Sequence, residues 1–472
     1  MKILLTGATG YIGKRLLPVL VQAGHQVVCC TRDLERFNPP DSLKSNVEAI
    51  RVDLLDKESL ENIPTDIQAA YYLVHSMSSA DNYAELEKQA AINFRTKLHT
   101  TEVEQVIYLS GIVNEDTLSK HLQSRKTVED ELGKGKYHLT TLRAGIIIGS
   151  GSASFEIIRD LVEKLPIMIA PKWLKTRCQP IGISDVMLYL SRALFCQPLY
   201  DNNYDIGGTD ILSYKEMLLG YAKVRGLKRS IFTVPVMSPR LSSYWLYLVT
   251  STSYKLAVAL VDSMKVEVVC RESNINELLE IEPISYEEAL EKAFAKIDNN
   301  EIVSSWKDSQ VSGVRNFNIS DFVKVPSYGC FTDVRAQKYE DKKRTIAKIW
   351  GIGGKNGWYH ANVLWKLRGL LDKLFGGVGL RRGRTSQTSL AAGDALDFWR
   401  VLYANREKGR LLLFAEMKLP GEAWLEFSIE GDKVVQTATF RPKGVLGRLY
   451  WYAVLPFHGI VFSGMLNKVA HA

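Results

Sequence analysis

Three glycines near the start of the chain constrain its fold more than any other feature. Gly7, Gly10 and Gly13 follow an apolar run typical of a strand and open a stretch with helical periodicity. The first glycine permits a tight turn, the second lets a pyrophosphate approach the backbone, and the third lets the helix pack closely on the strand. The free N–H groups of such a helix attract phosphate. The pattern predicts a dinucleotide-binding turn made by Thr6, Gly7, Thr9, Gly10, Tyr11, Ile12 and Gly13.

The sequence after this turn alternates short apolar runs with helical stretches, which is typical of a doubly wound parallel sheet of the α/β class, a Rossmann domain. The expected strands are Lys2–Thr6, Gln26–Cys30, Val47–Val52, Ala69–Val74, Gln105–Leu109 and Leu139–Leu142. The expected helices between them are Tyr11–Gln22, Tyr83–Thr100 and Ser124–Leu132. Four further helices are expected on the substrate side of the same unit, at Ser154–Leu165, Asp185–Phe195, Tyr214–Val224 and Tyr286–Asp298. The loop Gly149–Ser154 is expected to be flexible and to cover that side.

The end of the second expected strand distinguishes the two nicotinamide dinucleotides. An NAD site places an acidic residue there, which hydrogen-bonds the ribose 2′-hydroxyl. Here Thr31 and Arg32 follow the strand, and a guanidinium in this place can pair with the 2′-phosphate of NADP. Asp33 comes one residue later and keeps NAD open as the less favoured alternative. The residues therefore favour NADP.

Short motifs elsewhere in the first 300 residues carry a resemblance to a known family. They are Val52-Asp53-Leu54, Tyr108-Leu109-Ser110-Gly111, Leu142-Arg143-Ala144-Gly145 and Tyr204-Asp205-Ile206-Gly207-Gly208. Together with the glycine turn, they make this part of the chain similar to atypical, NmrA-like short-chain dehydrogenases/reductases. The resemblance implies that cofactor contacts come from the strand ends, with Ser110 beside the nicotinamide. The other residues it implies are Asp53, Leu54, Val74, His75 and Ser76.

The chain departs from that family at the catalytic pair. Active members carry Tyr-x-x-x-Lys on a helix, where the spacing puts both side chains on one face and the lysine lowers the tyrosine pKa. In the corresponding place this chain has His121 and Arg125. Histidine can donate a proton near neutral pH, whereas arginine can hold the nicotinamide ribose but cannot release a proton. Two interpretations remain: Ser110, His121 and Arg125 form a variant catalytic set, or the nucleotide site is redox-silent.

A change of pattern marks a second domain. We expect a Rossmann domain over residues 1–300, a polar linker over 301–321 and an α+β domain over 322–472. The elements expected in the second domain are a helical stretch at Trp358–Leu374, strands at Ala395–Asn405, Arg410–Lys418, Ala423–Gly431 and Lys433–Pro442, and a helix at Leu446–Val469. This order resembles a START-like helix-grip domain, and also the uncharacterised domain that follows NmrA-like reductases in bacteria. The resemblance implies an apolar cavity between the sheet and the terminal helix.

Charge and cysteine spacing exclude several classes of function. The net charge of +8 over 472 residues is not gathered into one long basic run, so no nucleic-acid partner is expected. The six cysteines have no paired spacing, which predicts neither a metal site nor a disulfide framework. Cys29 and Cys30 lie in an apolar run and are interpreted as packing residues. A reducing compartment fits this usage.

Two apolar stretches, Leu241–Met264 and Leu449–Met465, approach the length of a membrane segment. Serines, threonines and Lys255 interrupt the first, and Pro456 and His458 interrupt the second, so no transmembrane segment is expected. Peripheral contact with a membrane stays open. Because the first strand begins directly after Met1, no cleavable signal is expected, and the cytoplasm is the expected compartment.

These observations support two main hypotheses for the function. The first is an NADP-dependent reductase of a hydrophobic carbonyl or quinone-like molecule, bound in the N-terminal cleft or the C-terminal cavity. The second is a redox-silent NADP sensor or regulatory protein. A carrier of hydrophobic ligands is a third, less favoured, hypothesis.

Overall fold

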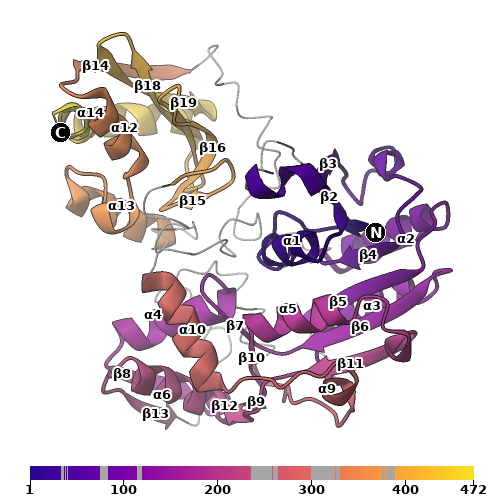
Figure 1. The fold of residues 1–472 in the computed structure, drawn as a ribbon. Helices are drawn as coiled ribbons and strands as arrows, with labels where there is room; N and C mark the ends of the chain where they lie inside the picture. The colour runs from indigo at the N-terminus through magenta and orange to yellow at the C-terminus, as the bar shows by residue number, and fades with distance from the viewer. Residues whose placement is uncertain are drawn as a thin grey trace. The chain divides into compact units, whose positions relative to one another are not determined.

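The computed structural model describes residues 1–32, 34, 37, 39, 41–74, 83–113, 120–234, 258, 264–298, 325, 330–374, 377, 379 and 389–471. The chain forms two compact units, Met1–Val311 and Ser312–Ala472 (Figure 1).

The N-terminal unit is built on a parallel sheet of seven strands. Their order is β11-β6-β5-β4-β1-β2-β3. Strands β2 and β3 therefore lie on one side of β1, and β4 and the later strands lie on its other side. These strands are β1 (Lys2–Leu5), β2 (Gln26–Thr31), β3 (Val47–Arg51), β4 (Ala69–Tyr72), β5 (Gln105–Gly111), β6 (His138–Ala144) and β11 (Asn202–Ile206). The doubly wound parallel sheet expected from the sequence is confirmed.

Helices cover both faces of this sheet, and alternate residues of each strand point to opposite faces. On one face, Ile3, Leu5 and Cys29 pack with α1 (Gly13–Gln22) and α5 (Ile183–Arg192). On the other face, Leu4 and Cys30 pack with α2 (Tyr83–Leu98) and α3 (Lys120–Leu132) (Figure 1). The two adjacent cysteines therefore belong to different cores, and both are buried packing residues.

The remaining elements of this unit come later in the chain than β6. They are β7 (Ile147–Ile148), α4 (Ala153–Lys164), β8 (Ile167–Pro171), β9 (Arg177–Cys178), β10 (Ile181–Gly182), β12 (Leu212–Ser213), α6 (Tyr214–Val224), β13 (Ser230–Val234), α9 (Ile275–Leu278) and α10 (Tyr286–Asp298). Short 3-10 helices lie at Asp41–Asn46, Ser59–Asn62, Lys172–Lys175 and Gln197–Leu199. Helices α4, α6 and α10 share a core of their own, in which Phe155, Tyr221 and Phe294 contact one another.

The C-terminal unit is an antiparallel sheet with helices, which confirms the expected α+β class. The sheet order is β14-β19-β18-β17-β16-β15. The elements are β14 (Phe331–Lys338), α12 (Lys342–Trp350), a 3-10 helix (Gly354–Asn356), α13 (Asn362–Leu374), β15 (Ala395–Leu396), β16 (Trp399–Asn405), β17 (Arg410–Ala415), β18 (Gly421–Glu430), β19 (Lys433–Pro442) and α14 (Gly444–Ala470). The sequence did not indicate β14 and α12.

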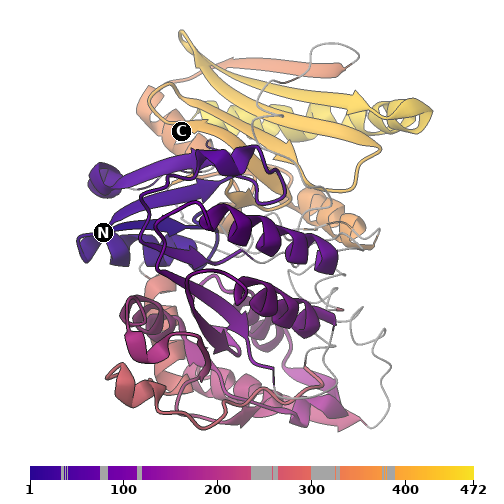
Figure 2. The same cartoon turned by 90° about the vertical axis from the view of Figure 1, so that its right-hand side faces the viewer.

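Helix α14 lies against one face of this sheet (Figure 2). The ring of Trp451 stacks on those of Phe331 and Phe440, at centroid distances of 5.4 and 5.8 Å. Among the described residues, one helical segment, Leu446–Ala470, is long and apolar enough to cross a membrane. The helix continues through Pro456, which was expected to interrupt the apolar segment.

His458 is partly buried among aromatic rings of the same helix. Its ring lies 5.0 Å from Trp451 and 4.6 Å from Phe462, while Nδ1 is 3.8 Å from a carboxylate oxygen of Asp333. Burial lowers the pKa of His458 below its ordinary 6.5; the carboxylate of Asp333 opposes this shift and Arg335 adds to it. The imidazole is therefore neutral in the folded unit at pH 7.

Acidification is expected to destabilise the C-terminal unit through this histidine. Below pH 6.5 the unfolded chain takes up a proton that the folded chain does not, so the free energy of unfolding falls as the pH drops from 6.5 toward the lowered pKa. Thermal melts between pH 7.5 and 5 test this. His458→Leu should show a shallower fall of melting temperature than the wild type, and parallel curves would contradict the assignment.

Candidate functional site

The glycine turn lies where the strand order reverses, between β1 and β4, which is where open α/β sheets bind ligands. Gly7 has a φ of 68°, and a Cβ there would lie 2.8 Å from the carbonyl oxygen of Leu73. A Cβ on Gly13 would lie 2.3 Å from the carbonyl oxygen of Gly7, so only glycine allows the helix this close to the turn. The N–H of Gly10 donates to the same carbonyl at 2.8 Å. The turn thus has the closed form that the spacing predicts.

The start of α1 can receive an anion. Ile12 occupies the N-cap and provides no side-chain hydrogen bond, and the first turn carries no acidic residue. The first N–H groups of the helix therefore keep the partial positive charge that stabilises phosphate.

Thr6 and Tyr11 have mainly structural contacts in the turn. The hydroxyl of Thr6 donates to the carbonyl of Tyr71 at 2.9 Å and accepts from the N–H of Leu73 at 3.1 Å, which joins the ends of β1 and β4. Burial raises the pKa of Tyr11 to about 12, so its phenol stays protonated. Arg15 stacks on the Tyr11 ring at 4.0 Å.

The second glycine/serine loop, residues 149–154, differs from its expectation because it is buried and hydrogen-bonded. The guanidinium of Arg15 donates to the carbonyl of Ser150 at 2.8 Å, which ties this loop to α1. The Ser152 hydroxyl donates to the carbonyl of Ile147 at 2.8 Å and accepts from the N–H of Phe155, so it caps α4. The loop is a wall of the site.

Some of the residues predicted to contact the cofactor at the strand ends already have contacts within the protein. Thr31 is buried at the end of β2, and Arg32 next to it is exposed. The carboxylate of Asp53 accepts from the N–H of Leu55 at 3.0 Å, and buried Leu54 accepts from Asn93 through its carbonyl.

Val74 is partly exposed just beyond β4. His75 and Ser76 lie outside the described residues.

Ser110 and Arg125 both lie near the carboxyl end of β5. The Ser110 side chain is buried, and its Oγ has no hydrogen-bond partner among the described residues. Arg125 of α3 lies against the following residue, Gly111, since a Cβ there would contact the Arg125 Cδ at 3.4 Å. The buried Nε of Arg125 is likewise without a partner in the described part of the chain. The backbone of His121 lies in the first turn of α3. Its side chain is not among those that the structure describes.

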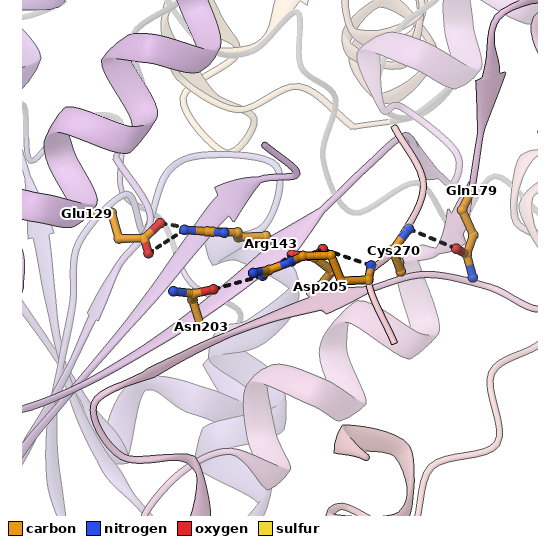
Figure 3. Close-up of polar contacts among 7 residues, drawn as sticks. Glu129, Arg143, Gln179, Asn203, Asp205 and Cys270 are labelled. Carbon is orange, nitrogen blue, oxygen red and sulfur yellow. Dashed lines mark hydrogen bonds and ion pairs between the residues drawn. The ribbon is translucent and has the colours of Figure 1, made fainter. Parts of the chain in front are cut away.

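A buried ion pair holds α3 in this position (Figure 3). Arg143 at the end of β6 donates to both carboxylate oxygens of Glu129 in α3, at 2.7 and 3.0 Å. The two side chains are 7% and 11% exposed. Glu129 is one helical turn from Arg125, so the pair fixes the height of Arg125 over the strand end. Sequence reasoning missed Glu129, although a charged residue inside an apolar strand, Arg143, signalled a partner.

A second polar group closes the neighbouring strand end. Arg271 donates to both oxygens of buried Asp205 at 2.8 Å and to Asn203 at 2.8 Å (Figure 3). The hydrogen bonds that Arg271 donates to Asp205 raise the pKa of its guanidinium. Gln179 accepts from the N–H of Cys270 at 3.1 Å and donates to the carbonyl of Gly208 at 2.7 Å. The segment that carries Arg271 is thereby attached to β11.

The described residues contain no group of three or more histidines, cysteines or acids that could hold a metal ion.

The two units match different families of known proteins. Residues 3–111 match the NAD dependent epimerase/dehydratase family, and residues 329–465 match a family described as "Protein of unknown function (DUF2867)". An uncharacterized protein of Saccharomyces cerevisiae is 32% identical over 94 residues, which are 20% of this chain and 32% of that protein. The chain therefore spans about a third of the length of this relative.

Two solved structures resemble the N-terminal unit. Triphenylmethane reductase of Citrobacter sp. aligns with a TM-score of 0.51 and 16% identity, covering 62% of this chain and all of that one. A nucleoside-diphosphate-sugar epimerase of Staphylococcus aureus aligns with a TM-score of 0.50 and 16% identity, covering 61% and 99%. The N-terminal unit thus shares the Rossmann fold of these two proteins.

A methyl group at Gly13 is expected to disrupt the turn. Gly13→Ala places its Cβ 2.3 Å from the Gly7 oxygen, so we expect a loss of about 2 kcal/mol or more in unfolding free energy. Gly10→Ala, with its nearest contact at 3.1 Å, should cost less. Gly459→Ala meets nothing within 4 Å in α14 and serves as the control. Urea unfolding measures all three, and equal stability of the Gly13 and Gly459 variants would refute the close approach.

Removing one partner of the Glu129–Arg143 pair is expected to be costly. Arg143→Met leaves the Glu129 carboxylate buried and unpaired, which should lower the unfolding free energy by about 3–5 kcal/mol. The double variant Arg143→Met/Glu129→Leu should recover most of this loss, because two apolar side chains need no partner. A double variant no more stable than the single one would show that the carboxylate is not the cause.

Proposed function

We propose that this chain is an NADP-dependent reductase of a hydrophobic carbonyl or quinone-like small molecule. In this proposal the N-terminal unit is of the atypical, NmrA-like short-chain type and the C-terminal unit is a START-like, helix-grip ligand module. The observation that carries the proposal is the closed glycine turn at the switch point of the sheet, with Ser110 and Arg125 both near the next strand end but one. Bound NADPH would supply a hydride.

The residues present fit such a cofactor. The turn and the start of α1 would hold the pyrophosphate, while Arg32 at the end of β2 would pair with the 2′-phosphate. The buried Nε of Arg125 and Oγ of Ser110 lack partners in the described part of the chain, and a nicotinamide ribose and a substrate oxygen would provide them. Ile112 and Val268, whose side chains lie near Gly145 just beyond the strand ends, favour an apolar substrate.

Within this proposal the proton for the substrate oxygen comes from α3. Arginine cannot release a proton, so Arg125 binds and orients. His121, one turn earlier on the same helix, has the ordinary chemistry of a general acid near neutral pH. Ser110 would donate a hydrogen bond that holds the reacting oxygen.

The preference for NADP is tested at Arg32. Titration of protein fluorescence should give tighter binding of NADPH than of NADH, and Arg32→Glu should weaken NADPH by about tenfold or more without weakening NADH. Lys57→Glu makes the same change in net charge at an exposed site and should leave both affinities unchanged. Equal loss with both variants would make the effect one of overall charge and refute the assignment.

Turnover is measured as NADPH oxidation with menadione and a panel of aromatic aldehydes. If His121 is the acid, His121→Ala should lower kcat by about a hundredfold, with NADPH binding retained. Arg125→Ala should lower both kcat and the affinity for NADPH. Lys126→Ala, exposed on the same helix, is the control. A protein that binds NADPH, oxidises none of it and is unaffected by His121→Ala would be the redox-silent sensor instead.

One observation in the C-terminal unit favours the carrier role as the alternative. Gln436 is 1% exposed, and neither of its amide atoms has a hydrogen-bond partner among the described residues. The buried indole N–H groups of Trp365 and Trp399 also have no hydrogen-bond partner among these residues. Buried polar atoms of this kind are commonly met by water or by a ligand. In the turnover assay, menadione that quenches tryptophan fluorescence without being reduced would support the carrier role.

A further inference from the structure

Helix α14 has a second half that is packed in the core and a first half that is largely exposed, apart from Trp451, which stacks on the sheet. Val461, Phe462, Met465, Leu466 and Val469 are buried in the core of the C-terminal unit. In the first half, large apolar side chains are exposed instead: Leu446 by 74%, Leu449 by 61%, Tyr452 by 61%, Phe457 by 54% and Ile460 by 60%. Apolar groups gathered like this in water usually mark a contact surface.

Helix α13 has an exposed apolar face of its own. Val363, Leu367, Leu370, Leu371 and Leu374 recur at the spacing of one helical face, and each is between 41% and 77% exposed. The opposite side of the helix packs inward through Leu364 and Trp365.

Both exposed faces point away from the sheet on the same side. The inward residues of α13 and of α14 belong to one core, together with Leu425, Phe427 and Val434 of the sheet. The rings of Trp365 and Phe462 lie 6.2 Å apart and join the two helices. Since both helices cover one face of the sheet, the sides that they turn to solvent have a common direction.

The charge beside these faces has one sign. Helix α14 contains no acidic residue, and Arg448 and the preceding Lys443 are exposed. On α13, Lys366 is exposed, while the one acid, Asp372, is buried and accepts from the N–H groups of Gly379 and Lys418. Apolar side chains bordered by basic residues and free of exposed acids complement a bilayer with anionic headgroups.

We propose that the C-terminal unit binds peripherally to an anionic lipid bilayer through the exposed faces of α13 and α14. The helices lie in the interface and do not cross it, because the second half of α14 is part of the protein core. Leucines enter the acyl boundary, Tyr452 lies at headgroup level, and Lys366, Lys443 and Arg448 contact the headgroups. This goes beyond the proposed reductase and does not depend on it.

Cosedimentation of the full-length protein with vesicles tests the proposal. Wild type should sediment with vesicles of mixed phosphatidylcholine and phosphatidylglycerol, and less with phosphatidylcholine alone or at high salt. Leu367→Glu/Leu370→Glu and Leu446→Glu/Leu449→Glu should each lower the partition by about tenfold or more. Val334→Glu, on β14 and 60% exposed, is the control and should leave it unchanged.

Three results would overturn the proposal. The first is a wild type that does not sediment with anionic vesicles. The second is binding that neither pair of glutamates reduces. The third is a dimer in light scattering that the glutamates dissociate in the absence of vesicle binding, which would make the faces an interface between copies of this chain. Circular dichroism of each variant confirms folding before the assay.

Discussion

The N-terminal unit depends on one close approach between backbone atoms. Gly13 comes so near the carbonyl of Gly7 that no side chain can stand between them, and this places the start of α1 directly at the end of β1. The hydroxyl of Thr6 fixes the neighbouring strand in the same place, because it bonds both Tyr71 and Leu73. Strand, helix and adjacent strand therefore meet at one point, and the anion-attracting end of the helix faces the crevice of the sheet.

The opposite wall of the crevice depends on a different kind of interaction. There the height of α3 is fixed by the buried pair of Glu129 and Arg143, whose two parallel hydrogen bonds define both distance and orientation. This pair therefore also fixes the position of Arg125 beside Gly111. A backbone constraint thus forms one side of the site and a side-chain ion pair forms the other.

The sequence predicted those parts of the fold that local patterns encode. Glycine spacing and apolar periodicity located β1, α1 and the other central strands, and Tyr214–Val224 and Tyr286–Asp298 were located to the residue. Strand β14 was missed because it is half-buried along its length and carries charges such as Asp333 and Arg335, so its periodicity is weak. The partnership of Glu129 and Arg143 was missed because it joins a helix to a strand, and no local spacing encodes such a contact. The burial of residues 149–154 was missed for the same reason, since it rests on Arg15 from a distant helix.

The proline within α14 has a mechanical consequence. Pro456 has no N–H, so the carbonyl of Tyr452 lacks the hydrogen bond that would stiffen the helix at this point. The exposed side chains lie on both sides of Pro456, from Leu446 to Ile460, while the helix is anchored by Trp451 on the sheet and by the core from Val461 onward. A helix that lacks this hydrogen bond bends more easily at that point. The exposed segment can therefore change its angle slightly while both anchors hold the fold of the unit.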